Sequence, residues 1–445
     1  MIARTVLCFV CLLASFSAWA GELSLARAVE LAVENAPAIQ AAEAGRDAAK
    51  EDLIIGRAAL LPHLDLTGSY QYQTSKTRYD RSQNIFQPNL KYRDSTVALR
   101  MVQPLFDLER WAGYRQGEVS AEAGEMRLRL ERQRLILETV QTYLEVVTAQ
   151  SALRAARAKE EAAERLALQA EAVFEAGVSA FNERLDADSR RDLARAERLL
   201  AENNLDQATE RLDSLTGVMA AKVSPPAIFS ELSASLPEQS EVWELRAAEE
   251  ALSVRLARLQ FRTAEEEETK AWGSGMPKVE GFASIQGNRA TSGQLGTGTR
   301  ARDEAVGVQV TLPLFSGGGD WAQLRKSKKA ALQTAFALQD DIRLARLTAR
   351  QAFLGYSASI LQLHAMQKAI VSVKEAADAA RMGHEVGLRT MTEVLDADER
   401  RFEAEKNLAE AEAQLVFAEL QLKSSVGVLD TEPLPEVFGA GLKSP

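Results

Sequence analysis

Pairs of acidic residues near the starts of two predicted helices are the side chains most able to act together. Glu393 and Asp396 are three residues apart, and Glu183 and Asp186 repeat that spacing about 210 residues earlier. Side chains at i and i+3 share one helix face, so each pair can present two carboxylates to a ligand. Carboxylates there also complement the helix dipole, and a purely capping role remains the alternative.

No set of residues typical of an enzyme accompanies these pairs. The three histidines (His63, His364 and His384) are scattered, and the only cysteines, Cys8 and Cys11, lie near the N-terminus. No nucleophile or phosphate-binding loop has the sequence context that such chemistry needs. We therefore expect no enzymatic activity, no metal and no cofactor.

Residues 1–20 have the pattern of a secretory signal peptide. Arg4 supplies the positive start, residues 6–16 are apolar, and Ala18-Trp19-Ala20 forms a cleavage site of the small-x-small type. A membrane anchor is the less favoured alternative, because the apolar run is shorter than the ~20 residues of a helical span. Neither cysteine stands at the cleavage site, so we expect a non-lipidated mature chain.

The charge balance argues against a nucleic-acid partner. The chain has 53 Lys and Arg against 63 Asp and Glu, and removal of the signal makes it one unit more negative. Nucleic-acid binding requires a basic face. No other uninterrupted apolar run is long enough to cross a bilayer as a helix, but strands of a membrane barrel give a weaker signal for each segment.

The elements that carry the acidic pairs occur twice. Residues 141–144, 185–188 and 104–106 return as residues 351–354, 395–398 and 313–315. Agreement over so many positions predicts a duplicated structural unit. We divide the chain into a signal peptide (1–20), a first repeat (21–217), a connector (218–240), a second repeat (241–427) and an irregular C-terminal tail (428–445).

Each repeat is predicted to contain two strands and a set of long helices. Hydrophobic alternation predicts strands at about 63–73, 95–104, 277–287 and 304–314. Pro104 is expected to close the second strand, and Phe282 interrupts the alternation of the third. Helices are expected at about 25–60, 108–172, 183–215, 241–270, 321–381 and 393–425. The two longest would measure about 90–100 Å at ~1.5 Å per residue.

Four strands are too few to close a barrel in a membrane. The smallest membrane barrels use about eight strands, and an open sheet edge is unstable in lipid. If the strands span a membrane, the chain must therefore oligomerise, as a dimer with eight strands or a trimer with twelve. An exported chain of this kind points to the bacterial outer membrane, with the long helices in the periplasm.

Several motifs resemble the TolC family of outer-membrane efflux and secretion channel proteins. They are the duplicated strand ends (residues 103–107 and 312–318), the segment Asn35-Ala36-Pro37-Ala38-Ile39, and the turn and helix start from Val386 to Ala397. The resemblance covers essentially the whole mature chain.

The resemblance implies a mostly α-helical protein with a membrane β-barrel. Three chains would form a twelve-stranded β-barrel, continued by a long periplasmic α-helical barrel. The family acts as a passive exit duct of a tripartite efflux pump or a type I secretion system. The implied partners are a homotrimer, a periplasmic adaptor (membrane fusion) protein, an inner-membrane pump of RND or ABC type, and outer-membrane lipids.

Family roles also map onto residues of this chain. By resemblance, Arg389 would help to close the periplasmic entrance, while Glu393, Asp396 and their counterparts Glu183 and Asp186 would form an electronegative gate. In the first repeat Ser179 stands opposite Arg389, and His384 stands where the family often has Tyr. Adaptor contacts are expected at the turn residues Gly177, Val178, Gly387 and Leu388, and strand-to-helix junctions at Pro104, Phe106, Pro313 and Phe315.

Simpler interpretations remain open for these residues. Gly177 and Gly387 can serve only to supply a positive φ, and Arg389 can be a solvated turn residue. Tyr70, Tyr72 and Tyr92 could form an interfacial aromatic girdle or pack between protomers. For the whole chain, a periplasmic coiled-coil adaptor or structural protein is the rival class, although it leaves the four alternating segments unexplained.

Overall fold

The computed structural model describes residues 23–76, 89–177, 180–219, 223, 239–291 and 298–429. The predicted signal peptide, Val178, and most of the connector and C-terminal tail lie outside the described residues. The chain divides into two compact units. The first contains residues up to Glu43, Leu128–Arg255 and the chain from Asp341 onward, and the second contains Ala44–Arg127 and Leu256–Asp340.

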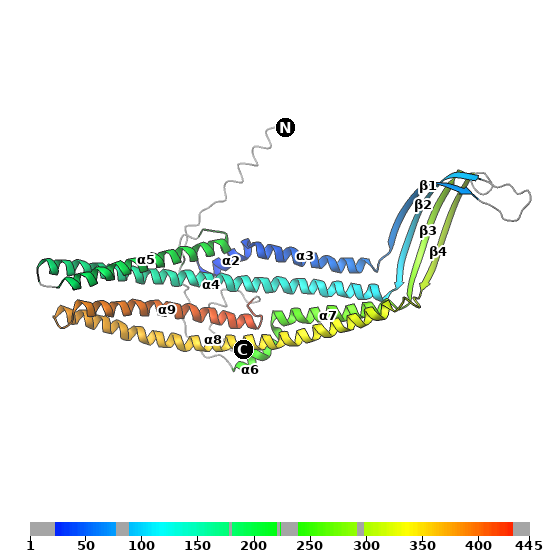
Figure 1. Cartoon of the computed structure of the whole chain (residues 1–445). Helices are drawn as coiled ribbons and strands as arrows, with labels where there is room; N and C mark the ends of the chain where they lie inside the picture. The colour runs from blue at the N-terminus through cyan, green and yellow to red at the C-terminus, as the bar shows by residue number, and fades with distance from the viewer. Residues whose placement is uncertain are drawn as a thin grey trace, which may run out of the picture. The chain divides into compact units, whose positions relative to one another are not determined.

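Most of the described chain is helical, and four strands form one sheet (Figure 1). The helices are α2 (Leu25–Asn35), α3 (Pro37–Ala58), α4 (Leu108–Glu175), α5 (Phe181–Thr216), α6 (Ser240–Glu250), α7 (Leu252–Gly273), α8 (Gly319–Glu385) and α9 (Met391–Ser425). The strands are β1 (His63–Lys76), β2 (Asn89–Phe106), β3 (Lys278–Ala290) and β4 (Thr299–Thr311). None of the described helices has the length and apolar character that a helical membrane span requires.

The sheet is antiparallel, with the strand order β1-β2-β3-β4. Its register aligns the apolar residues on one face, because Leu64 pairs with Met101, Met101 with Ala283, and Ala283 with Val306. The next row, from Asp65 through Arg100, lies on the opposite face. One face is therefore largely apolar and the other polar, as the period-two alternation requires.

Phe282 interrupts the alternation because it covers a glycine on the neighbouring strand. It pairs with Gly307 on β4, and a Cβ atom at Gly307 would lie 2.9 Å from the Phe282 ring. The Arg100 guanidinium of β2 lies over the same ring, 5.9 Å from the centroid. An aromatic side chain that fills the space beside a strand glycine stabilises the local pairing.

The strand ends differ from the sequence prediction. Pro104 does not close the second strand, since β2 continues to Phe106 through a register shift between Pro104 and Phe106. A bulge accommodates a proline because the proline has no N–H to donate to the ladder. In the second repeat Pro313 and Phe315 lie beyond the end of β4. Both hairpin loops are also shorter than predicted, because β2 begins at Asn89 and β4 at Thr299.

The half-length helices are also interrupted where the sequence predicts continuous helix. Ala36 is extended (ψ 122°) between α2 and α3, because a residue before proline, here Pro37, is disfavoured in the helical region. Ala251 makes the same break between α6 and α7 (ψ 132°) without a proline. The carbonyl of Glu250, just before the break, lies close to Gly427, where a Cβ would come within 2.9 Å.

Each unit has its own apolar contacts. In the first unit Val140, Tyr143 and Leu212 are fully buried in one cluster, and the Tyr143 hydroxyl donates to the Leu23 carbonyl (2.7 Å). In the second unit Val119 and Ala123 of α4 pack against Leu259 of α7. A Cβ atom at Gly117 would lie 2.5 Å from the Asp52 carbonyl oxygen, so α3 and α4 approach each other closely only because this residue is glycine.

Candidate functional site

The turn between α8 and α9 reverses the chain at Gly387, whose φ is 76°. This left-handed conformation strongly favours glycine. The N–H groups of Leu388 and Arg389 both donate to the Gly383 carbonyl, at 2.8 and 3.2 Å. These hydrogen bonds give a carbonyl in the last turn of α8 its partners. The Leu388 side chain is 83% exposed.

Glu393 closes a capping box at the start of α9. The Glu393 N–H donates to the Thr390 hydroxyl (3.3 Å), and the Thr390 N–H donates to the Glu393 carboxylate (2.8 Å). The backbone hydrogen bond from Thr390 lowers the pKa of Glu393 below its ordinary value. One of the four predicted gate carboxylates therefore has the capping role, although its exposed side chain stays accessible.

Arg389 lies on the same turn, and its aliphatic stem packs against Gly383. A Cβ at Gly383 would be 3.1 Å from the Arg389 Cγ. The Arg389 carbonyl lies 3.0 Å from the Nδ1 of His384. Within the described part of this single chain, Arg389 has no ion-pair partner.

The first turn, between α4 and α5, is held by different contacts. Gly177 has φ 74°, and the rings of Phe174 and Phe181 lie 5.9 Å apart across the turn. The Arg184 guanidinium lies over Phe174 (5.6 Å). The N-cap residue Ala180 makes no side-chain hydrogen bond, and Glu183 is exposed in the first turn of α5.

Arg190 of α5 connects the acidic positions of the two repeats. Its guanidinium lies 3.2 Å from Asp186 on the same helix and 3.2 Å from Asp396 on α9. The predicted gate residues Asp186 and Asp396 are thus brought together, whereas Glu183 and Glu393 do not take part in this bridge. The hydrogen bond with Asp396 raises the pKa of Arg190.

Lys159 of α4 forms a second bridge further from the turns. Its ammonium group lies 2.9 Å from Glu197 of α5 and 2.6 Å from Glu399 of α9. Burial opposes the charge on Lys159, but the hydrogen bonds with Glu399 and Glu197 outweigh that effect and raise its pKa. Lys159 and Arg190 together tie α9 to the α4–α5 hairpin.

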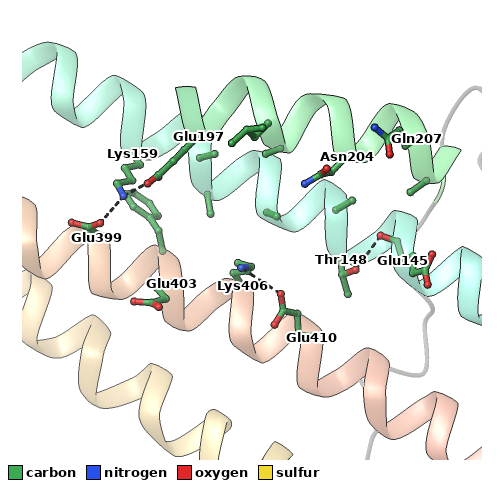
Figure 2. A pocket seen from close by; sticks show the side chains of 18 of the residues that line it. Glu145, Thr148, Lys159, Glu197, Asn204, Gln207, Glu399, Glu403, Lys406 and Glu410 are labelled. Carbon is green, nitrogen blue, oxygen red and sulfur yellow. Dashed lines mark hydrogen bonds and ion pairs between the residues drawn. The ribbon is translucent and has the colours of Figure 1, made fainter. Parts of the chain in front are cut away.

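The Lys159 bridge stands at one end of a groove of about 890 Å³ between α4, α5 and α9 (Figure 2). Small residues of α4, including Ala149, Ala152 and Ala156, line it and leave it hollow. Glu403, Lys406 and Glu410 extend along its α9 side, and Lys406 pairs with Glu410 on its own helix (3.6 Å).

The sequence did not single out Lys159, Arg190 or Glu399. The spacing of Asp186 and Arg190 is that of a helical i, i+4 ion pair, which could have drawn attention to Arg190. Their contacts to α9 depend on packing between segments about 200 residues apart, for which no local pattern exists.

The two strand-to-helix junctions are also unequal. At the first, which includes Pro104 and Phe106, the buried Asp107 accepts from the Arg110 N–H (3.2 Å), and Arg110 also pairs with Glu280 of β3 (3.1 Å). At the second, Pro313 and Phe315 are followed by Gly317 and Gly318, both with positive φ. Phe315 is largely exposed there.

A model of the family described as "Outer membrane efflux protein" matches residues 28–218 and 245–428. The chain is 29% identical over 431 residues to outer membrane protein TolC of Vibrio cholerae, covering 96% of this chain and 95% of the relative. It is 27% identical over 422 residues to the alkaline protease secretion protein AprF of Pseudomonas aeruginosa, covering 93% and 86%.

Solved structures share the fold. The outer membrane protein VceC of Vibrio cholerae matches with a TM-score of 0.75 and 18% identity, covering 91% of this chain and 96% of that chain. The Campylobacter jejuni CmeC outer membrane channel also matches with a TM-score of 0.75 and 18% identity, covering 92% and 87%. At this identity the likeness concerns the fold alone.

Proposed function

Because the chain belongs to the outer membrane efflux protein family, we propose that it is an outer-membrane exit duct, which passively conducts substrates from periplasm-spanning machinery to the exterior. The observation that carries this proposal is a four-stranded sheet with one apolar and one polar face, joined directly to long helices. An apolar face suits lipid, and a polar face suits an aqueous lumen.

We propose a homotrimer as the working assembly. Within the described sheet, β1 and β4 each pair on one side only. Three chains would join these edges into a twelve-stranded β-barrel, which removes the open edges that lipid does not tolerate. The long helices would then form an α-helical barrel in the periplasm, with the two turns at its far end.

The entrance is proposed to be gated at these turns. Arg389, Glu393, Asp396, Glu183 and Asp186 are the gate residues expected from the family. The bridges from Arg190 to Asp396 and from Lys159 to Glu399 support this proposal, because each ties α9 to the other hairpin of the same chain. Breaking them would free α9 to move outward.

The partners are proposed to be a periplasmic adaptor and an inner-membrane pump of RND or ABC type. The exposed side chain of Leu388 and the tip residues Gly177, Val178 and Gly387 would contact the adaptor. Relatives named for TolC and for protease secretion leave both drug efflux and type I protein secretion as cargo classes. Specificity would lie mainly in the pump.

A deletion strain tests the proposal. We expect greater susceptibility to drugs, loss of secreted proteins from the medium, or both, with recovery on complementation by the full chain. No change in either phenotype would overturn the exit-duct function. Release of the protein by osmotic shock, without detergent, would instead favour a periplasmic adaptor, and heating an SDS-resistant species to monomer would support the trimer.

A further inference from the structure

Arginines gather on the apolar face of the sheet, at the end that carries the hairpin loops. The sheet register places them on neighbouring strands, since Ser95 pairs with Arg289, and Arg289 pairs with Arg300. Alternate residues share a face. We call this group the arginine rim, and its members are Arg93, Arg289, Arg300 and Arg302.

The arginine rim keeps a constant spacing from the apolar residues. Arg93 stands four residues from Val97, Arg289 four residues from Ile285, and Arg302 four residues from Val306. Four residues of strand correspond to about 13 Å. On three strands, therefore, an arginine stands at a similar distance beyond the last large apolar side chain of that face.

The rim charges are poorly neutralised by the protein. Arg302 lies 2.7 Å from Glu304 on its own strand, whereas Arg93, Arg289 and Arg300 form no side-chain ion pair with any described residue. Arg289 and Arg300 stand directly opposite each other, and like charges in that position are destabilising. A bound anion between them would remove this repulsion.

Aromatic side chains continue the same face next to the rim. Tyr70 and Tyr72 of β1 are 70% and 61% exposed, and Tyr70 pairs with Ser95, the neighbour of Arg289 across β2. Tyr92, by contrast, lies on the polar face and donates to Gln73 (2.8 Å), so only two of the three tyrosines can belong to a girdle. Exposed tyrosines beside an apolar band are typical of a membrane interface.

We propose that the arginine rim binds the phosphate groups of a phosphorylated glycolipid in the outer leaflet, with the acyl chains lying along the apolar face. The proposal rests on the proposed function, since it requires that this face contacts lipid. Guanidinium groups bind phosphate oxygens in a bidentate manner. Several phosphates on one rigid head group would match arginines held on adjacent strands better than a single mobile phosphate would.

Native mass spectrometry of the detergent-solubilised full-length protein tests the site, with purified lipid A as the probe. The triple variant Arg93→Gln, Arg289→Gln, Arg300→Gln is expected to bind lipid A about 100-fold more weakly, at about fivefold per arginine. Arg100→Gln is the matched control, because Arg100 lies on the opposite face of the same sheet. It should bind lipid A as the unmodified protein does.

Further arms of the experiment identify the source of the phosphate. Dephosphorylated lipid A should bind weakly to the unmodified protein, and millimolar inorganic phosphate should not displace lipid A. Equal binding of lipid A by the triple variant and the unmodified protein, or equal binding of the dephosphorylated lipid, would overturn the proposal. Displacement of lipid A by inorganic phosphate would also overturn it, because the arginine rim would then be a site for free anions.

Conductance in planar bilayers separates this inference from the exit-duct function. The triple variant should form channels of unchanged conductance. If the triple variant forms channels and still binds lipid A as the unmodified protein does, only the lipid site is overturned. If the purified unmodified protein shows no channel activity at all, the exit-duct function is overturned. If the triple variant does not assemble, Arg300→Gln alone is measured, with an expected loss of about fivefold.

Discussion

The two helix turns occupy equivalent places in the repeats, yet they are built from different interactions. The α4–α5 turn is closed by the rings of Phe174 and Phe181, whereas the α8–α9 turn is closed by the capping box of Thr390 and Glu393. In both repeats the chain thus reverses at a glycine, but different contacts stabilise the two turns. A common scaffold can therefore carry two turns with different stability and different exposed chemistry.

The largest effect is expected from loss of both bridges that tie α9 to the first hairpin. Lys159→Gln with Arg190→Gln should shift the closed-to-open equilibrium by about tenfold, because each exposed ion pair contributes up to about 1 kcal/mol. The open probability of single channels in planar bilayers measures the shift. Lys406→Gln is the control, since Lys406 lines the same groove but, among the described residues, pairs only within α9. An equal rise in the open probability of the control would show that the two bridges do not hold the channel closed.

Exchanging the caps tests the difference between the turns themselves. Thr390→Ala should destabilise the start of α9 by about 1 kcal/mol, and Ala180→Thr should stabilise the start of α5 by a similar amount, because Glu183 stands where Glu393 completes the box. Amide hydrogen exchange near each turn should change by about fivefold in opposite directions. If Ala180→Thr gives no added protection, the aromatic contact already fixes the first turn.

The pH dependence of gating should reflect Lys159. Its pKa is raised above the ordinary 10.5, so the bridge contributes stability at lower pH and loses it as pH rises through the folded-state pKa. Open probability should therefore rise about threefold as the pH increases above 10.5 and through the folded-state pKa, given the modest energy of one exposed pair. The rise should be absent in Lys159→Gln, and its persistence there would implicate another group.

Arg389→Ser, which copies Ser179 of the first repeat, should have the smallest effect. Its stem packs against Gly383, and its guanidinium has no ion-pair partner among the described residues, so single-channel conductance should rise by less than about twofold, within the range of a surface substitution. A rise well above about twofold would place the main closing contact on Arg389 and between copies of the chain, and an unchanged conductance would remove Arg389 from the gate.

The sequence predicts elements better than the contacts between them. Alternation and length locate the four strands and the long helices, and Gly177 and Gly387 mark the turns. The break at Pro37 has a local cause in the sequence, because a residue before proline is disfavoured in the helical region. The break at Ala251 has no such cause, and the carbonyl just before it lies against the distant Gly427. The bridge from Arg190 to Asp396 was equally hidden, since it joins two helices from different repeats.

The Lys159 bridge has no counterpart in the second repeat. Ala369 stands at the position equivalent to Lys159, and Ser189 at the position equivalent to Glu399. By contrast, Arg400 corresponds to Arg190 and, among the described residues, has no ion-pair partner. In the proposed trimer it would be free to reach Asp186 of a neighbouring copy.

In a ring of three such chains, the six interfaces between neighbouring hairpins would therefore alternate between two kinds. Interfaces within a chain carry two layers of ion pairs, at Arg190 and at Lys159. Interfaces between chains can carry one, at Arg400. Moving one hairpin away from its partner in the same chain would require both layers to break, so the three interfaces within chains would set the free energy of full opening.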